Sequence, residues 1–566
     1  MNLQGRSFIF FLIIILFGCK GQPENQNPDS ADSISYRSVS FHIEPDSQMI
    51  QRAAQLGFND VCIQTEGNTR KRLQQIRELE KEKGYMAYAK SLGMTTSLWM
   101  REISNYDEAL GPVSIKNDTF WSKTASKYDH YFIELVPEVD YVVFTVVESQ
   151  FNIADNKAIL NKMIALVNDK CKEYGKKLIL RTFVHHPNEL DTLEKQLSSL
   201  PEDVAIMSKY VESDWNLRGP HHRLIGKVGG RDQIIELDIV GEYFRVTYVP
   251  NCFTDNLASR FNYWKDQGID GISVRVTREP RPGAWWEPLI FPHSIYAEPN
   301  EVNLWALGYL ATGKKNAVDK AWEDFVKFYF GENHTNKIIN ILRPQGNILS
   351  AALNVGTSPF GCLRLKIPGE WTMNGKHCSC GDTIAVVYPD SIDFLYSNPF
   401  HHKLSPHVWH PELTQSYHMS RKGDPEIIAL KEKEFSAVIS LSDSLIREFK
   451  TLQNSLDEDV YQYYLFKLEE NNWHLRVMRH WQLSWLKAAN MLYFGLRDKT
   501  KQEEIEKHFD SLILLNEFSG DHLSMNWHGK QIDIYRGEYL NIPGYITMFT
   551  GYWKNVLQGS AIENFQ

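Results

Sequence analysis

Three acidic residues follow closely after three apolar runs that are predicted to form β-strands. They are Glu148 after run 141–147, Asp214 after run 205–211 and Glu242 after run 234–240. Hydrolysis of a glycosidic bond needs one protonated carboxyl group for the leaving oxygen and one carboxylate that acts as nucleophile or activates water. Carboxylates that meet at one end of a sheet would supply both groups, so their spacing predicts acid–base chemistry.

Two basic residues accompany these carboxylates. Arg181 lies in run 177–184 and Lys209 lies in run 205–211. An arginine fork and a lysine point charge are both suited to holding an acidic group of a substrate. The residues alone are compatible with two other interpretations of these charged side chains. Charged residues at strand ends often form rim salt bridges, and Lys209 inside a barrel could instead form the Schiff base of an aldolase.

Positioning these groups at one edge requires a parallel sheet. From residue 36 to residue 300, about eight or nine short apolar runs alternate with helical patterns. This pattern is typical of parallel strands covered on both faces, and it predicts a (β/α)8 TIM barrel with reactive side chains at the carboxyl ends of its strands. A doubly wound open sheet is the alternative, but no Gly-rich phosphate turn follows the early strands.

Helical periodicity predicts the remaining elements. Residues 70–92 read as one long helix closed by Gly93. Residues 301–566 predict a mostly helical C-terminal domain, with a loop rich in His and aromatic residues at 360–420. The helices expected there span residues 304–310, 316–330, 426–455, 459–497 and 502–517.

The first residues are expected to be a targeting segment. An apolar run over residues 8–17 leads to Cys19, and the sequence Leu16-Phe17-Gly18-Cys19 resembles a bacterial lipobox. We therefore expect residues 1–19 to be a lipoprotein signal peptide with Cys19 as the lipidated residue. Residues 20–35 are polar and predict a flexible tether. The chain is expected at the bacterial cell envelope, attached to the membrane only through this lipid anchor, on the periplasmic or cell-surface face of the outer membrane.

Composition narrows the classes of function. The chain has 566 residues, 43% of them hydrophobic and 23% charged, which excludes a disordered protein. A net charge of −9 without a basic tract argues against nucleic acid as a partner. Six cysteines besides Cys19 are too few for a disulfide framework in a chain of this size. The sequence predicts no metal and no cofactor.

The barrel strands resemble those of glycoside hydrolase family 67, the α-glucuronidases. The matching residues are Arg181-Thr-Phe-Val184, Lys209 placed five positions before Asp214, Arg218-Gly-Pro220 and Glu242-Tyr243. The chain looks like a divergent member that lacks the family's β-rich domain before the barrel. The resemblance implies a TIM barrel that acts on a glycan containing uronic acid.

The resemblance also implies a role for each matching residue. Asp214 and Glu242 would share the general-base role, and Glu148 would be the general acid of an inverting, exo-acting enzyme that removes a terminal uronic acid. Arg181, Lys209 and Arg218 are expected to contact this substrate.

Two tryptophans are expected beside this site. Trp285 and Trp286 follow the last strand, so they would stack on sugar rings at its rim or seal the barrel against the helical region. A surface glycan-binding lipoprotein on a non-catalytic barrel is the alternative function.

Overall fold

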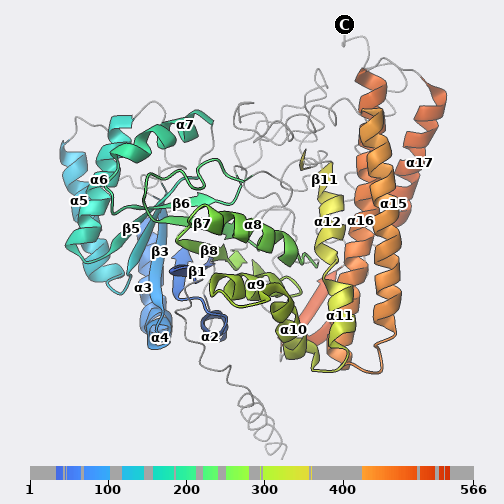
Figure 1. Cartoon of the computed structure of the whole chain (residues 1–566), viewed down its shortest axis with the longest axis horizontal. Helices are drawn as coiled ribbons and strands as arrows, with labels where there is room; N and C mark the ends of the chain where they lie inside the picture. The colour runs from blue at the N-terminus through green and yellow to red at the C-terminus, as the bar shows by residue number, and fades with distance from the viewer. Residues whose placement is uncertain are drawn as a thin grey trace, which may run out of the picture.

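The chain forms a closed barrel followed by a helical region, as seen in a computed structural model (Figure 1). The described residues are 33–42, 45, 47–64, 69–101, 118–145, 157–183, 187–211, 221–239, 250–278, 293–294, 298–355, 358–359, 424–493, 498–516, 522–527 and 530–535. Among the helices in these ranges, none is both long enough and apolar enough to cross a membrane.

The barrel consists of eight parallel strands in sequence order, with the eighth paired to the first. This confirms the predicted TIM barrel. The strands are β1 Tyr36–Phe41, β2 Asp60–Gln64, β3 Thr95–Arg101, β4 Tyr141–Thr145, β5 Lys177–Arg181, β6 Ala205–Lys209, β7 Gln233–Asp238 and β8 Gly271–Arg275. Strands β5, β6 and β7 end earlier than the apolar runs suggested, since Arg181, Lys209 and Asp238 are their last residues.

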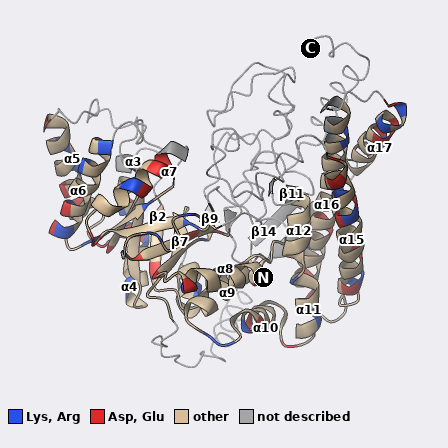
Figure 2. Cartoon of the chain, turned by 45° about the horizontal axis from the view of Figure 1, so that its top comes forward, with Lys and Arg blue, Asp and Glu red and all other residues tan. Residues whose placement is uncertain are grey.

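Helices cover the outside of the barrel. They are α2 Ser47–Gln55, α3 Thr69–Lys83, α4 Tyr85–Ser91, α5 Asp118–His130, α6 Lys157–Glu173, α7 Pro187–Gln196 and α8 Thr254–Asp266, with a π-helical turn η1 at Tyr131–Leu135. The outer strand residues pack against these helices, as Leu98, Val142 and Leu180 do in the core next to α5 and α6. Figure 2 shows residues of both charges on the exposed faces of α5 and α6.

The expectation of a single helix over residues 70–92 was wrong. Gly84 separates α3 from α4, and its φ of 62° lies in the left-handed region, where glycine carries no steric penalty. Glu80 accepts hydrogen bonds from the backbone N–H groups of Met86 (2.7 Å) and Ala87 (3.0 Å). One carboxylate thus satisfies two donors at the start of α4, which stabilises the break between the helices.

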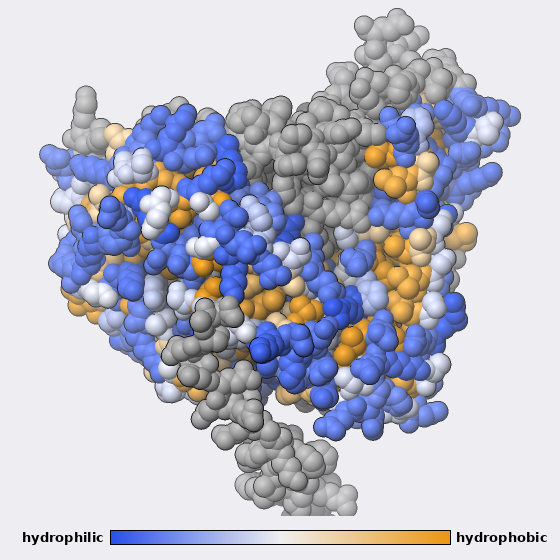
Figure 3. All heavy atoms as spheres, viewed as in Figure 1, coloured by the Kyte–Doolittle hydropathy of each residue, from blue (hydrophilic) through white to orange (hydrophobic). Residues whose placement is uncertain are grey.

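The C-terminal region is mostly helical, as predicted. Its helices are α9 Glu301–Ala311, α10 Ala317–Phe330, α11 Thr335–Leu342, α12 Gln345–Leu353, α15 Pro425–Lys450, α16 Glu458–Tyr493 and α17 Lys499–Asn516. Short strand pairs were not expected there: β11 Asn354–Val355 with β12 Ser358–Pro359, and the hairpin of β13 His522–Trp527 with β14 Lys530–Tyr535. Figure 3 shows apolar residues on the surface of this region. Leu430 and Leu441, both on α15, are among its exposed large apolar side chains.

The barrel and the C-terminal helices share one hydrophobic core. Helix α9 lies directly on the chain that follows α2, because a Cβ added at Gly308 would stand 2.3 Å from the Leu56 carbonyl oxygen. Beside this contact the buried carboxylate of Glu301 accepts hydrogen bonds from Arg52 (2.8 Å), Trp305 (3.0 Å) and Tyr329. Buried polar groups of two regions are therefore satisfied jointly, which fixes the helical region against the barrel.

The parallel register places alternate residues of all eight strands on the inner face. The middle of this interior is apolar and contains Cys62, Val143, Ile179, Met207 and Ile234. Both ends of the interior are polar. The apolar layer separates the polar side chains at one end of the barrel from those at the other.

The polar group at the amino-terminal end centres on Asp60. Its Oδ2 accepts hydrogen bonds from Tyr36 (2.9 Å), Ser38 (2.7 Å) and Ser97 (2.7 Å), and its Oδ1 accepts one from Thr95 (2.8 Å). Burial raises the pKa of Asp60 to about 6, although these hydrogen bonds act to lower it. This end of a TIM barrel serves stability, so we assign Asp60 a structural role.

The raised pKa of Asp60 predicts a pH-dependent stability. Between pH 4 and 6 the native state binds the proton more tightly than the unfolded chain does, so raising the pH destabilises the native state. Relative to Asp60→Asn, the wild-type chain should lose about 2 kcal/mol of unfolding free energy between pH 4 and pH 6, which is most of the roughly 3 kcal/mol that the full shift from 3.8 to about 6 represents. Thermal unfolding midpoints of both proteins at pH 4, 5, 6 and 7 measure the difference. Parallel pH profiles for the two proteins would contradict it.

Candidate active site

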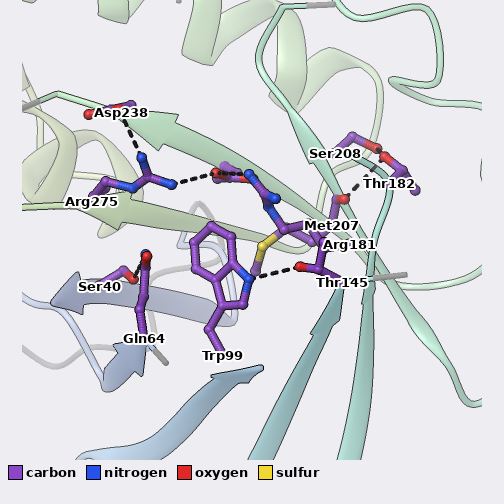
Figure 4. A network of polar contacts seen from close by, with 11 residues as sticks. Ser40, Gln64, Trp99, Thr145, Arg181, Thr182, Met207, Ser208, Asp238 and Arg275 are labelled. Atoms are coloured by element: carbon purple, nitrogen blue, oxygen red, sulfur yellow. Dashed lines mark hydrogen bonds and ion pairs between the residues drawn. The ribbon is translucent and has the colours of Figure 1, made fainter. Parts of the chain in front are cut away.

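Charged and aromatic side chains gather at the carboxyl ends of the barrel strands, where TIM-barrel enzymes carry their active sites. They stand on the inner face above the apolar layer (Figure 4). We define the mouth cluster as Trp99, Thr145, Arg181, Lys209, Glu236, Asp238 and Arg275, together with Phe183 just after β5. All of them are buried.

Arg181 and Glu236 form the central ion pair of the mouth cluster. Arg181 Nε donates to Glu236 Oε2 at 2.6 Å, and Arg181 Nη2 donates to Glu236 Oε1 at 2.8 Å. The exposed fractions of the two side chains are 4% and 3%. The pair joins β5 to β7 through two parallel hydrogen bonds, the most specific geometry available to an arginine and a carboxylate.

A second arginine extends this pair into a chain of alternating charges. Arg275 Nη2 lies 3.6 Å from Glu236 Oε1, and Arg275 Nη1 donates to Asp238 Oδ2 at 3.1 Å. The order Arg181, Glu236, Arg275, Asp238 crosses β5, β7 and β8. With Lys209, the mouth cluster as defined above contains three basic side chains and two acidic ones.

Aromatic rings hold the cations in place. The Arg181 guanidinium lies 4.1 Å from the centre of the Trp99 ring and 4.7 Å from that of Phe183. Trp99 is itself fixed, since its Nε1 donates to Thr145 Oγ1 at 2.8 Å. The Lys209 ammonium lies 4.0 Å from the centre of the Phe183 ring. Desolvated cations over ring faces gain attraction from the π electrons, so these rings stabilise the positive charges at the mouth.

The electrostatics decide what Glu236 can do. Burial acts to raise the pKa of Glu236, but Arg181, Lys209 and Arg275 outweigh it and hold the pKa below its ordinary value. Glu236 is thus an anion near neutral pH. A general acid must carry a proton at that pH, so Glu236 cannot fill that role.

Two of the predicted site residues lie at this mouth. Arg181 and Lys209 lie 4.7 and 4.0 Å from the centre of the Phe183 ring, and Arg181 also forms the ion pair with Glu236. The other predicted residues fall outside the described ranges: the catalytic carboxylates Glu148, Asp214 and Glu242, the substrate contacts Arg218, Trp285 and Trp286, and Cys19. Their positions and roles stay predictions.

Glu236, Asp238, Arg275 and Trp99 were not predicted as site residues from the sequence. The sequence held a signal for two of them, because Glu236 and Asp238 stand two positions apart in the otherwise apolar run 234–240. Side chains with that spacing share one face, and two acids on one face of a buried strand point to the barrel interior. The described residues contain no group of three or more His, Cys, Asp or Glu side chains that could hold a metal ion.

Comparisons with known proteins support the fold. No family model and no curated protein matches the sequence. A solved GH138 enzyme targeting pectin rhamnogalacturonan II is similar over 86% of this chain, with a TM-score of 0.56 and 11% identity, and this chain covers 63% of its length. A GH115 4-O-methyl-α-glucuronidase with specificity for decorated arabinogalactans matches 86% of this chain and 58% of its own, with a TM-score of 0.46 and 12% identity.

A third solved structure, a Thermobaculum terrenum O-GlcNAc hydrolase variant, matches 93% of this chain and 97% of its own, with a TM-score of 0.41 and 10% identity. At such low identities a likeness shows the fold alone. The chain thus has a glycoside hydrolase-like TIM barrel with distant similarity to these structures. No comparison assigns it to a family, and the resemblance to family 67 stays a prediction.

Proposed function

We propose that this chain is an exo-acting glycoside hydrolase that removes a terminal, α-linked uronic acid from a glycan with inversion. The observation that carries the proposal is the buried guanidinium of Arg181 at the barrel mouth. This guanidinium packs over the ring of Trp99 and donates two hydrogen bonds to Glu236. Arginine has five N–H donors, and among the described residues the Nη1 group of Arg181 donates to none, so it is available to the carboxylate of a sugar acid.

The surroundings of Arg181 favour an acidic substrate. Arg181 and Lys209 lie 4.7 and 4.0 Å from the centre of the same ring, that of Phe183. A uronic acid would bring a negative charge that matches these two cations, whereas a neutral sugar would not.

In the proposed reaction the three carboxylates take the roles that the family resemblance implies. Glu148 protonates the leaving oxygen while Asp214 and Glu242 activate a water molecule on the opposite face of the sugar. An inverting enzyme leaves roughly 6.5–9.5 Å between acid and base to admit this water. Arg181 and Lys209 hold the uronate group, which orients the sugar ring between the carboxylates.

The proposal predicts which sugar anomer is released first. The purified protein is incubated with glucuronate-decorated oligosaccharides, and the released uronic acid is followed by proton NMR from the first minutes. Inversion of an α-linkage gives the β-anomer as the first product, before mutarotation mixes the two forms. Initial release of the α-anomer would contradict inversion, and release of neutral sugars alone would contradict a uronic acid substrate.

A second prediction separates a hydrolase from a glycan-binding protein. Glu148→Gln removes the proposed acid and should reduce turnover by about 100-fold or more, while substrate affinity stays within about twofold of wild type. Asp60→Asn, at the opposite end of the barrel, is the control and should retain turnover. Unchanged turnover in Glu148→Gln would overturn its role as acid. If borohydride instead trapped a substrate adduct on Lys209, the result would favour the hypothesis that the protein is a Schiff-base aldolase.

We also propose that the protein is anchored to the bacterial cell envelope through a lipid on Cys19. When the chain is expressed in a bacterium fed radioactive palmitate, the wild-type protein should carry the label and sediment with membranes. Cys19→Ala should be unlabelled and remain in the supernatant. Equal labelling of both proteins would contradict lipidation at Cys19.

A further inference from the structure

Arg181 uses only part of its hydrogen-bonding capacity. Its Nε and Nη2 atoms donate to Glu236, and Nη1 donates to no residue within the ranges that the structure describes. Two of the five N–H groups are thus engaged, and the Nη1 edge carries two more. Because Glu236 binds the opposite edge, the ion pair determines which edge of the guanidinium a ligand can reach.

The orientation of Arg181 is restrained by three groups at once. Glu236 fixes the in-plane rotation of the guanidinium through two hydrogen bonds of 2.6 and 2.8 Å. The rings of Trp99 and Phe183 fix its tilt at 4.1 and 4.7 Å from their centres. An arginine loses much rotamer freedom when it is immobilised, and here that cost is met before any ligand binds.

Glu236 does more than pair with one arginine. Its Oε1 also lies 3.6 Å from Arg275 Nη2, and Arg275 is held by Asp238 at 3.1 Å. As a device for stability such a buried charge chain is weak, because desolvation of the ions offsets most of their attraction. What the arrangement does provide is a fixed direction for two guanidinium groups.

We infer that Glu236 is a positioning residue that directs the Nη1 edge of Arg181 toward the carboxylate of the bound sugar acid. This inference rests on the proposed function, because it takes a uronic acid as the ligand. Glu236 itself does not touch the sugar. It acts through Arg181. The length of the Glu236 side chain, which carries the carboxylate from the backbone of β7 to the guanidinium, therefore matters as well as its charge.

Two substitutions separate the position of Glu236 from its charge. Glu236→Asp keeps the negative charge but withdraws it by one methylene, so the paired hydrogen bonds to Arg181 cannot both form. Glu236→Gln keeps the length but removes the charge, which makes the mouth more positive. If Glu236 acted through charge alone, Asp would behave like wild type, and Gln would bind an acidic sugar more tightly.

The test measures dissociation constants for D-glucuronate and for its neutral methyl ester by calorimetry at pH 7. Wild type should prefer glucuronate. Glu236→Asp should weaken glucuronate binding by about 10-fold or more, the size of one well-placed charge-assisted hydrogen bond, and change ester binding by less than about twofold. Asp60→Asn is the matched control, a buried acid of the same barrel, and should retain the wild-type preference.

A double-substitution cycle supplies the second readout. Arg181→Lys keeps the charge but loses the fork, so it should also lose the preference for glucuronate. Adding Glu236→Asp to Arg181→Lys should then change the affinity by less than about twofold, because the positioned group is already gone. Additive effects of the two substitutions would overturn the inference.

The outcomes distinguish the two proposals. If wild type binds glucuronate no more tightly than the ester, the uronic acid substrate is wrong and the inference falls with it. If wild type prefers glucuronate and Glu236→Asp shows the same preference, the proposed substrate stands and the positioning role of Glu236 is wrong.

Discussion

A buried ion pair between Arg181 and Glu236 is the interaction on which the candidate site depends. Two charges removed from water cost free energy unless their geometry is excellent, and here two hydrogen bonds of 2.6 and 2.8 Å provide that geometry. The pair lies at the carboxyl end of the strands, so it fixes a cation at the place where a TIM barrel binds its substrate. Trp99 lies against Arg181, and Arg275 lies near Glu236, so each of them contacts one partner of this pair.

Closure of the barrel is what makes the pair possible. Arg181 and Glu236 stand on β5 and β7, which are separated by β6, and the curvature of the sheet turns both side chains toward one axis. The same alternation divides the interior into a polar end around Asp60, an apolar middle and a charged mouth. The two ends of the interior therefore shift the pKa of a buried acid in opposite directions. Burial raises the pKa of Asp60 at the amino-terminal end, whereas three cations hold the pKa of Glu236 at the mouth below its ordinary value.

The strand pattern predicted this architecture well, because few other folds are compatible with unbroken apolar runs that alternate with helices. Arg181 and Lys209 stood out in the sequence as basic residues within apolar runs, and the structure places them at the ends of β5 and β6. Glu236 was missed because, in run 234–240, attention went to Glu242 behind the run and not to the acids within it. The break at Gly84 was missed because charged residues on both sides continue the helical pattern, and only the backbone conformation of the glycine reveals the turn.

Partners across the barrel could not be predicted, because the spacing of residues in the sequence does not say which strands approach each other at the mouth. The bond from Arg181 to Glu236 spans 55 positions. The roles of Glu148, Asp214 and Glu242 rest on the family resemblance for the same reason: sequence order places them on separate strands and leaves their distances open.

The proposed function requires that the mouth of this barrel holds the carboxylate of a sugar acid against Arg181. The decisive experiment is a crystal structure of the protein saturated with D-glucuronate. A carboxylate oxygen of the sugar should lie about 3 Å from Arg181 Nη1, with the hydrogen bonds from Arg181 to Glu236 intact. A sugar bound at the mouth with its carboxylate turned away from Arg181 would show that Arg181 does not bind this group.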